Sequence, residues 1–87
     1  MKVEEFRAIM QTDYADDPMT PYDGCKVLKG LNLIAKYLPT SGVEGINHDI
    51  LYACSQEALA DDITEEDAIQ LRKWGWFING GYLASFA

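Results

Sequence analysis

The stretch Ile63–Phe86, ITEEDAIQLRKWGWFINGGYLASF, decides the fold because it contains the signals that begin and end a helix. Thr64 is a suitable N-cap, since its hydroxyl can accept a hydrogen bond from a free backbone N–H. Asp67, three residues later, suits the reciprocal position of a capping box. Acidic residues fill the expected first turn and basic residues the last, as the helix dipole favours. Gly75 can adopt the left-handed conformation that ends a helix, so we expect a helix between Thr64 and Gly75.

The residues after this helix predict a two-stranded antiparallel β-hairpin. Two runs rich in aromatic and aliphatic residues, 76–78 and 82–86, flank the tripeptide Asn79-Gly80-Gly81. Asn and Gly tolerate the positive φ angles that tight hairpin turns require. The same stretch holds both tryptophans of the chain. We therefore expect this region to bury both indoles against the preceding helices, with Trp76 packed on Leu71.

Apolar residues at helical spacing predict further helices over residues 3–11, 20–37 and 41–54, and a single helical turn at 57–60. The helix at 20–37 has one wide apolar arc: Val27, Leu28, Leu31, Ile34, Ala35 and Leu38. Leu33 and Tyr37 lie among lysines on its opposite arc, where either the hairpin or a partner packs. Gly30 in its middle would permit a close crossing with another element. The helix at 41–54 begins with a capping box and has an apolar face: Val43, Ile46, Ile50, Ala53 and Cys54.

These elements predict an α+β fold, with three to four helices and a C-terminal two-stranded antiparallel β-hairpin in a single domain, residues 1–87. A length of 87 residues suits one modest core, and a hydrophobic fraction of 48% is ordinary for a globular chain. No apolar run approaches the roughly 20 residues of a membrane span. The first residues, MKVEEFRAIM, carry acids where an export signal carries bases, so we expect no export signal. Cys25 and Cys54 are then expected to be reduced core thiols.

Acidic residues dominate the charge. Seven bases against fourteen acids give a net charge of −7, and no Lys or Arg occurs from Tyr37 to Leu71. Nucleic-acid phosphates would be repelled by such a surface, whereas a protein partner with a basic surface would be attracted. The acids at the start of the C-terminal helix are the candidate partner-binding residues: Asp61, Asp62, Glu65, Glu66 and Asp67. Helix capping and solubility are the competing explanations for these acids.

The sequence contains no pattern that indicates catalysis, a cofactor or a metal site. His48 is the single histidine, and no spacing of Cys or His residues typical of a metal site is present. On a helix over 41–54, His48 and Tyr52 would lie one turn apart and fasten the helix to its neighbours. With Trp76 they form the alternative candidate site, a pocket for a small ligand.

Several motifs resemble small acidic proteins of phage and prophage type. The similarity covers roughly residues 29–87 and rests on the motifs KGLNLIAKY, NHDILYA, ITEEDAIQLRKWGWFI and SFA. The residues that carry it are Lys36, Tyr37, His48, Asp49, Tyr52, Leu71, Gly75, Trp76 and Phe86. The resemblance implies a bacterial cytoplasm as the setting. It also implies a class of proteins that often bind and inhibit host machinery, including defence systems.

The sequence is therefore compatible with two functions. The first is a non-enzymatic interaction protein, encoded by a phage, that modulates or inhibits a host protein with a basic surface. The alternative is a small-ligand or nucleotide-binding protein that acts as a homo-oligomer. An enzyme is disfavoured, since a chain with one His has few groups for acid–base chemistry.

Overall fold

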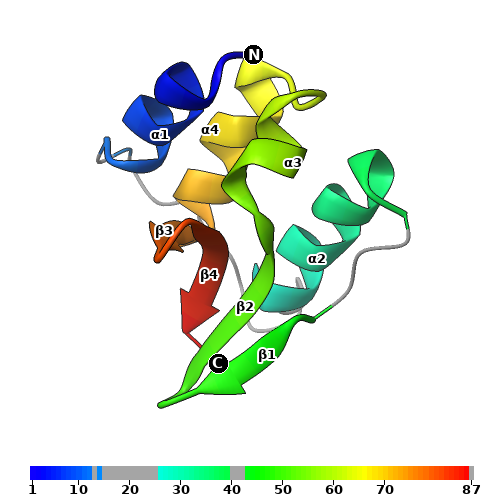
Figure 1. The fold of residues 1–87 in the computed structure, drawn as a ribbon, viewed down its shortest axis with the longest axis vertical. Coiled ribbons are helices and arrows are strands. Elements are labelled where there is room, and N and C mark those ends of the chain that lie inside the picture. The colour runs from blue at the N-terminus through cyan, green and yellow to red at the C-terminus, as the bar shows by residue number, and fades with distance from the viewer. Residues whose placement is uncertain (13, 15–25, 40–42, 87) are drawn as a thin grey trace.

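The fold consists of helices and an antiparallel sheet whose strands do not follow one another in chain order (Figure 1). The computed structural model describes residues 1–12, 14, 26–39 and 43–86. In chain order the elements are α1 (Val3–Met10), α2 (Lys26–Tyr37), β1 (Gly45–Asn47), β2 (Ile50–Ser55), α3 (Gln56–Ala60), α4 (Glu65–Lys73), β3 (Phe77–Asn79) and β4 (Tyr82–Phe86). The strands form one antiparallel sheet of four in the order β1-β2-β4-β3. The α+β class is confirmed, but the described sheet has four strands where the sequence predicted two.

The capped helix of the C-terminal third is present as α4. The Thr64 hydroxyl accepts a hydrogen bond from the backbone N–H of Asp67 at 3.2 Å. At the other end Gly75 has φ +88°, the N–H of Gly75 donates to the Arg72 carbonyl, and the N–H of Trp76 donates to the Leu71 carbonyl. This pair of hydrogen bonds is the Schellman motif, which reverses the chain after a helix. The reversal directs Trp76 back over Leu71 and into the core, as the sequence predicted.

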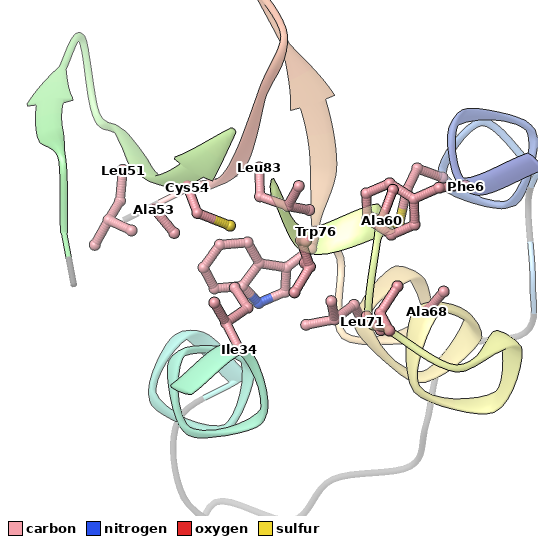
Figure 2. Packing of buried hydrophobic residues seen from close by; sticks show 13 residues of the cluster. Phe6, Ile34, Leu51, Ala53, Cys54, Ala60, Ala68, Leu71, Trp76 and Leu83 are labelled. Atoms are coloured by element: carbon pink, nitrogen blue, oxygen red, sulfur yellow. The ribbon is translucent and has the colours of Figure 1, made fainter. Parts of the chain in front are cut away.

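Trp76 occupies the centre of the core between the sheet and α2 (Figure 2). Its side chain is fully buried, whereas Trp74 is only partly buried, so the prediction that both indoles are buried holds in full for one of them. The indole lies against Gly30 of α2, where a Cβ atom would come within 2.0 Å of Trp76 Nε1. The close crossing that the sequence suggested at Gly30 is therefore the contact between α2 and Trp76.

The predicted helix over residues 41–54 is wrong. Within the described residues, this segment forms a hairpin of β1 and β2, and its two-residue turn is His48-Asp49. Both turn residues have positive φ, 51° and 66°. Along its other edge, β2 pairs with β4, thirty or so residues away in the sequence. This distant pairing outweighs the local helix-start signal, because strand formation depends on neighbouring strands more than on local propensity.

The predicted apolar arc of α2 is confirmed for Val27, Leu31, Ile34 and Leu38, which pack in or against the core, but the buried face is centred closer to Gly30 than predicted. Leu28, expected in the core, has 57% of its surface exposed, whereas Leu33 and Tyr37 from the opposite arc pack against the core. Gly30 and Ile34 are the fully buried positions of the helix. The helix is thus rotated so that its smallest residue faces Trp76. The predicted start at Thr20 and the second thiol, Cys25, lie outside the described residues.

Replacing Gly30 by Ala is expected to destabilise the protein. Alanine improves helix propensity by about 1 kcal/mol, but its Cβ would overlap the Trp76 indole, and overpacking of this kind costs about 1–3 kcal/mol. The net result should be a lower free energy of unfolding, measured by urea titration followed through tryptophan fluorescence. The matched control is Gly45→Ala, whose Cβ would meet nothing within 4 Å. A Gly30→Ala variant more stable than the wild type would contradict this packing.

Replacing His48-Asp49 by Asn-Gly is expected to stabilise the protein by about 1 kcal/mol, because Asn and Gly adopt the left-handed conformation at lower cost. If the segment were helical instead, the glycine would destabilise it by about the same amount. The sign of the change in unfolding free energy therefore distinguishes a hairpin from a helix.

Candidate functional site

The sheet has one face toward the helices and one face away from them. Side chains alternate between the faces of a strand, and partners in register share a face. Leu51, Ile78 and Leu83 lie on the inner face, and Figure 2 shows α2 and α4 on the side to which Leu51 and Leu83 point. By the same register, the residues of the outer face are Gly45, Asn47, Ile50, Tyr52, Ser55, Phe77, Asn79, Tyr82, Ala84 and Phe86.

Four aromatic side chains and the aliphatic Ile50 cover this outer surface, which we call the aromatic face: Tyr52, Phe77, Tyr82 and Phe86, with Ile50. The rings of Tyr52 and Tyr82 meet edge to face, with centroids 6.5 Å apart and an interplanar angle of 86°. The rings of Phe77 and Phe86 lie 5.0 Å apart. The solvent-exposed fraction is 43% for Tyr82 and 67% for Phe86, which is high for large apolar side chains. In the described part of the chain, the aromatic face is thus a contiguous apolar surface that is open to solvent.

A hollow of about 340 Å³ opens on this face beside β1. It is lined by Glu44, Gly45, Tyr52 and Tyr82. The backbone N–H of Glu44 donates to the Tyr52 carbonyl at 2.7 Å, which holds the start of β1 beside β2. The Tyr52 hydroxyl accepts a hydrogen bond from Asn79 Nδ2 at 3.1 Å. The walls of the hollow are therefore fixed by contacts from three of the sheet's strands.

Charge is distributed unevenly between the helices and the sheet. The seven basic residues are Lys2, Arg7, Lys26, Lys29, Lys36, Arg72 and Lys73. They lie on α1, α2 and α4 or just before α1, and none lies in a strand. The sheet instead has Glu44 at its margin and Asp49 in the β1–β2 turn. The aromatic face is accordingly apolar with a negative margin.

Of the acids proposed as partner-binding residues, four are exposed and one is engaged within the molecule. Asp61, Asp62, Glu65 and Glu66 are exposed around the α3–α4 connection. This connection lies at the opposite end of the molecule from the β1–β2 turn (Figure 1). Asp67 is half-buried and bonds to α2. The exposed four form a surface separate from the aromatic face.

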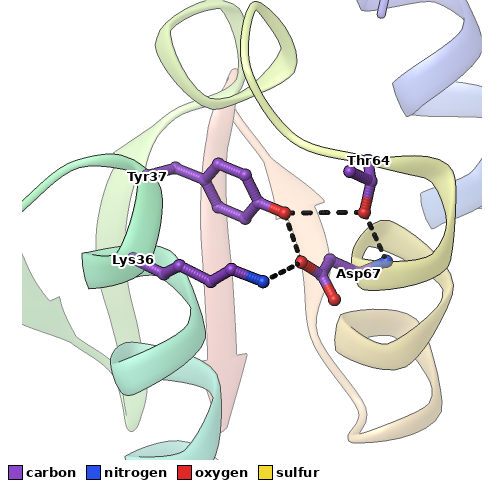
Figure 3. A network of polar contacts seen from close by, with 4 residues as sticks. All are labelled: Lys36, Tyr37, Thr64 and Asp67. Carbon is purple, nitrogen blue, oxygen red and sulfur yellow. Dashed lines mark hydrogen bonds and ion pairs between the residues drawn. The ribbon is translucent and has the colours of Figure 1, made fainter.

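The contacts of Asp67 join α4 to the end of α2 (Figure 3). Its Oδ2 atom accepts a hydrogen bond from the Tyr37 hydroxyl and forms an ion pair with Lys36 Nζ at 3.0 Å. The Tyr37 hydroxyl also lies 3.5 Å from Thr64 Oγ1. The Tyr37 hydroxyl, followed by Lys36, lowers the pKa of Asp67, and Asp67 in turn raises the pKa of Lys36. This carboxylate therefore stabilises the fold by fastening two helices.

The alternative pocket of His48, Tyr52 and Trp76 is not assembled. His48 is exposed in the β1–β2 turn, and Tyr52 lies on the outer face of the sheet. Trp76 is buried in the core behind the sheet. The expected spacing of His48 and Tyr52 by one helical turn is wrong, because both belong to a hairpin.

Two observations on the described residues concern nucleophilic and metal chemistry. Burial, followed by the charge of Glu44, raises the pKa of the Cys54 thiol to about 11, so its nucleophilic thiolate is scarce at neutral pH. Among the described residues, no group of three or more His, Cys, Asp or Glu side chains is placed to hold a metal ion.

The sequence did not indicate Glu44, Phe77 or Tyr82 as site residues, and Phe86 was noted only as part of the resemblance. A usable signal was the alternation Tyr82-Ala84-Phe86, which places two aromatic residues on one side of a strand. The pairing of β4 with β2 was needed to add Tyr52 to that side.

The chain matches no protein-family model, and neither the curated proteins nor the solved structures gave a significant match. Within the described residues, no helix has the length and apolar character needed to cross a membrane.

Replacing Asp67 by Asn is expected to lower the free energy of unfolding near neutral pH by about 1 kcal/mol, since it removes a charged hydrogen-bond acceptor and an ion pair. A carboxyl whose pKa is lowered by folding adds stability above its unfolded pKa of about 3.9 and loses it as the pH falls through the folded value. The difference between variant and wild type should therefore shrink as the pH is lowered from about 7 to about 2.

The control for this measurement is Glu66→Gln, which removes one negative charge from the same helical turn. Urea titrations across the pH range would give the unfolding free energies of all three proteins. An Asp67→Asn difference that stays constant with pH would contradict a stabilising role for the ionised carboxylate.

Proposed function

We propose that this chain is a non-catalytic interaction protein that binds a partner protein through its aromatic face. The observation that carries the proposal is the contiguous, solvent-exposed group of aromatic side chains on one side of the sheet. Contiguous exposed apolar surfaces mark interaction sites, and Tyr and Phe are enriched at protein interfaces. The low reactivity expected of Cys54 is consistent with a non-enzymatic role.

A protein suits this face better than a nucleic acid does. Sheets that bind single-stranded nucleic acids combine stacking aromatic residues with a positively charged groove. No strand of this sheet contains Lys or Arg, and Glu44 lies at the margin of the face. Phosphate groups would be repelled there, whereas a partner with apolar residues surrounded by bases would be attracted.

The exposed acids around the α3–α4 connection would also contribute to binding, by attracting a basic partner. Their distance from the aromatic face means that they act over a longer range, by raising the rate at which a basic partner approaches. The resemblance to small phage proteins supplies the biological setting. In that setting the partner is a host protein, and the chain modulates or inhibits it, as defence inhibitors do.

Quantitative capture from a bacterial lysate would test the aromatic face against the acidic surface. The bait is the full chain and three variants: Tyr82→Ser/Phe86→Ser, Asp61→Asn/Asp62→Asn/Glu65→Gln/Glu66→Gln, and Leu28→Ser as control. Leu28 on α2 is exposed to a similar extent, at 57%. We expect Tyr82→Ser/Phe86→Ser to reduce capture of the partner at least tenfold, roughly the effect of losing an interface hot spot, and Leu28→Ser to leave capture unchanged.

The acidic variant should reduce capture at low salt and have less effect as salt rises, because steering between exposed charges is screened. Equal capture by all four proteins would overturn the proposal. So would a wild-type dimer in sedimentation that the Tyr82→Ser/Phe86→Ser variant dissociates, because the aromatic face would then join copies of this chain. That result would favour the alternative of a homo-oligomer.

A further inference from the structure

The hollow on the aromatic face has the components of a site for a positively charged group. Two of its sides are the rings of Tyr52 and Tyr82, which stand at 86° to each other. A third side is Glu44, an acidic residue that is exposed to solvent. Cations are attracted to the faces of aromatic rings, and a nearby carboxylate adds direct charge pairing. Ring and carboxylate together favour a cation over a neutral group of the same shape.

The geometry of the hollow is set before any ligand arrives. Tyr52 is held by the hydrogen bond from Asn79 Nδ2 to its hydroxyl and by the edge-to-face contact with Tyr82. Glu44 is placed by the backbone hydrogen bond to the Tyr52 carbonyl. A ligand therefore does not have to order the Tyr52 side chain or the backbone of Glu44, which lowers the entropic cost of binding.

Within the described residues, no base of this chain occupies the hollow. The ion pair of the described residues joins Lys36 of α2 to Asp67 of α4 (Figure 3). The negative charge of Glu44 also reaches the interior, where it adds to the effect of burial in raising the pKa of Cys54. Glu44 thus presents a negative charge on an otherwise apolar surface.

We infer that this hollow binds a cationic side chain of the partner protein, with arginine preferred over lysine. This inference rests on the proposed function, since it names the chemistry of the partner at the aromatic face. The planar guanidinium can stack on a tyrosine ring while its N–H groups pair with the Glu44 carboxylate. The hollow opens directly onto the aromatic face, so a side chain inserted there would leave the rest of the partner on Phe77 and Phe86. That continuity points to a protein side chain as the source of the cation.

A direct test is to titrate the full-length, ¹⁵N-labelled chain with N-acetyl-arginine amide and to follow the backbone amides. The matched neutral probe is N-acetyl-citrulline amide, which has the same shape without the charge. We expect the arginine probe to shift the amides of Gly45, Tyr52 and Tyr82 and to bind about three- to fivefold more tightly than the citrulline probe. Tetramethylammonium is the third probe, because it is a free cation without a planar donor group, and it should bind more weakly than arginine.

Two variants assign the binding to the hollow. Glu44→Gln should weaken the arginine probe about threefold or more and leave the citrulline probe unchanged, while Tyr82→Leu should weaken both. Glu5→Gln removes an exposed acid from α1 and should change neither. Preserved dispersion of the amide spectrum shows that each variant is folded. Equal binding of arginine and citrulline, or no effect of Glu44→Gln, would overturn the inference, and tetramethylammonium binding as tightly as arginine would overturn the choice of a guanidinium.

The capture experiment separates this inference from the proposed function. If Tyr82→Ser/Phe86→Ser abolishes capture while the arginine probe shows no preference, the interaction face stands and the cation site fails. If the arginine probe binds as expected but capture is equal for all variants, the hollow is a cation site and the aromatic face is not the interface that captures the partner.

Discussion

The contact between Trp76 and Gly30 determines how the layers of this protein fit together. Trp76 follows directly on the stop of α4, leads into β3 and lies against α2, so one side chain joins three elements. Its indole N–H lies 3.5 Å from the Lys26 carbonyl, which gives the buried polar atom a partner. Since Gly30 has no Cβ, the backbone of α2 can approach the ring closely. A second attachment at the end of α2, through Tyr37 and Asp67, sets the angle of the helix.

The parts of this fold that the sequence predicted are those that local chemistry specifies. The cap at Thr64 and the stop at Gly75 are set by residues a few positions apart, and both are present in the structure. The β1–β2 hairpin could not be predicted in that way, because its stability comes from β4, far along the chain. His and Asp also tolerate positive φ, but unlike glycine they do not mark a turn in the sequence. The turn at His48-Asp49 could therefore not be recognised within a segment whose apolar spacing resembled that of a helix. The rotation of α2 was equally hidden, since it depends on Trp76.

The candidate site was less predictable than the fold for the same reason. Tyr52 and Tyr82 come from strands thirty residues apart in the sequence, and the register of β2 with β4 brings their rings together. Alternation along β4 indicates that Tyr82 and Phe86 share a face, but it does not indicate which face the helices cover. Asp67 illustrates the converse. In the sequence it belongs to a run of solvated acids, whereas in the structure its carboxylate is engaged by Lys36 and Tyr37.

An exposed aromatic face needs protection against association with other copies of the same chain. Both edge strands of the described sheet, β1 and β3, are only three residues long, which limits pairing between sheet edges. The net charge of −7 makes copies repel one another, and the sheet contains no base that would offset the acids at its margin. Contact of the face with itself would bring Glu44 residues together, whereas contact with a basic partner would pair them. The same distribution of charge that keeps copies of the chain apart therefore selects for a different protein, with cationic side chains, as the occupant of the aromatic face.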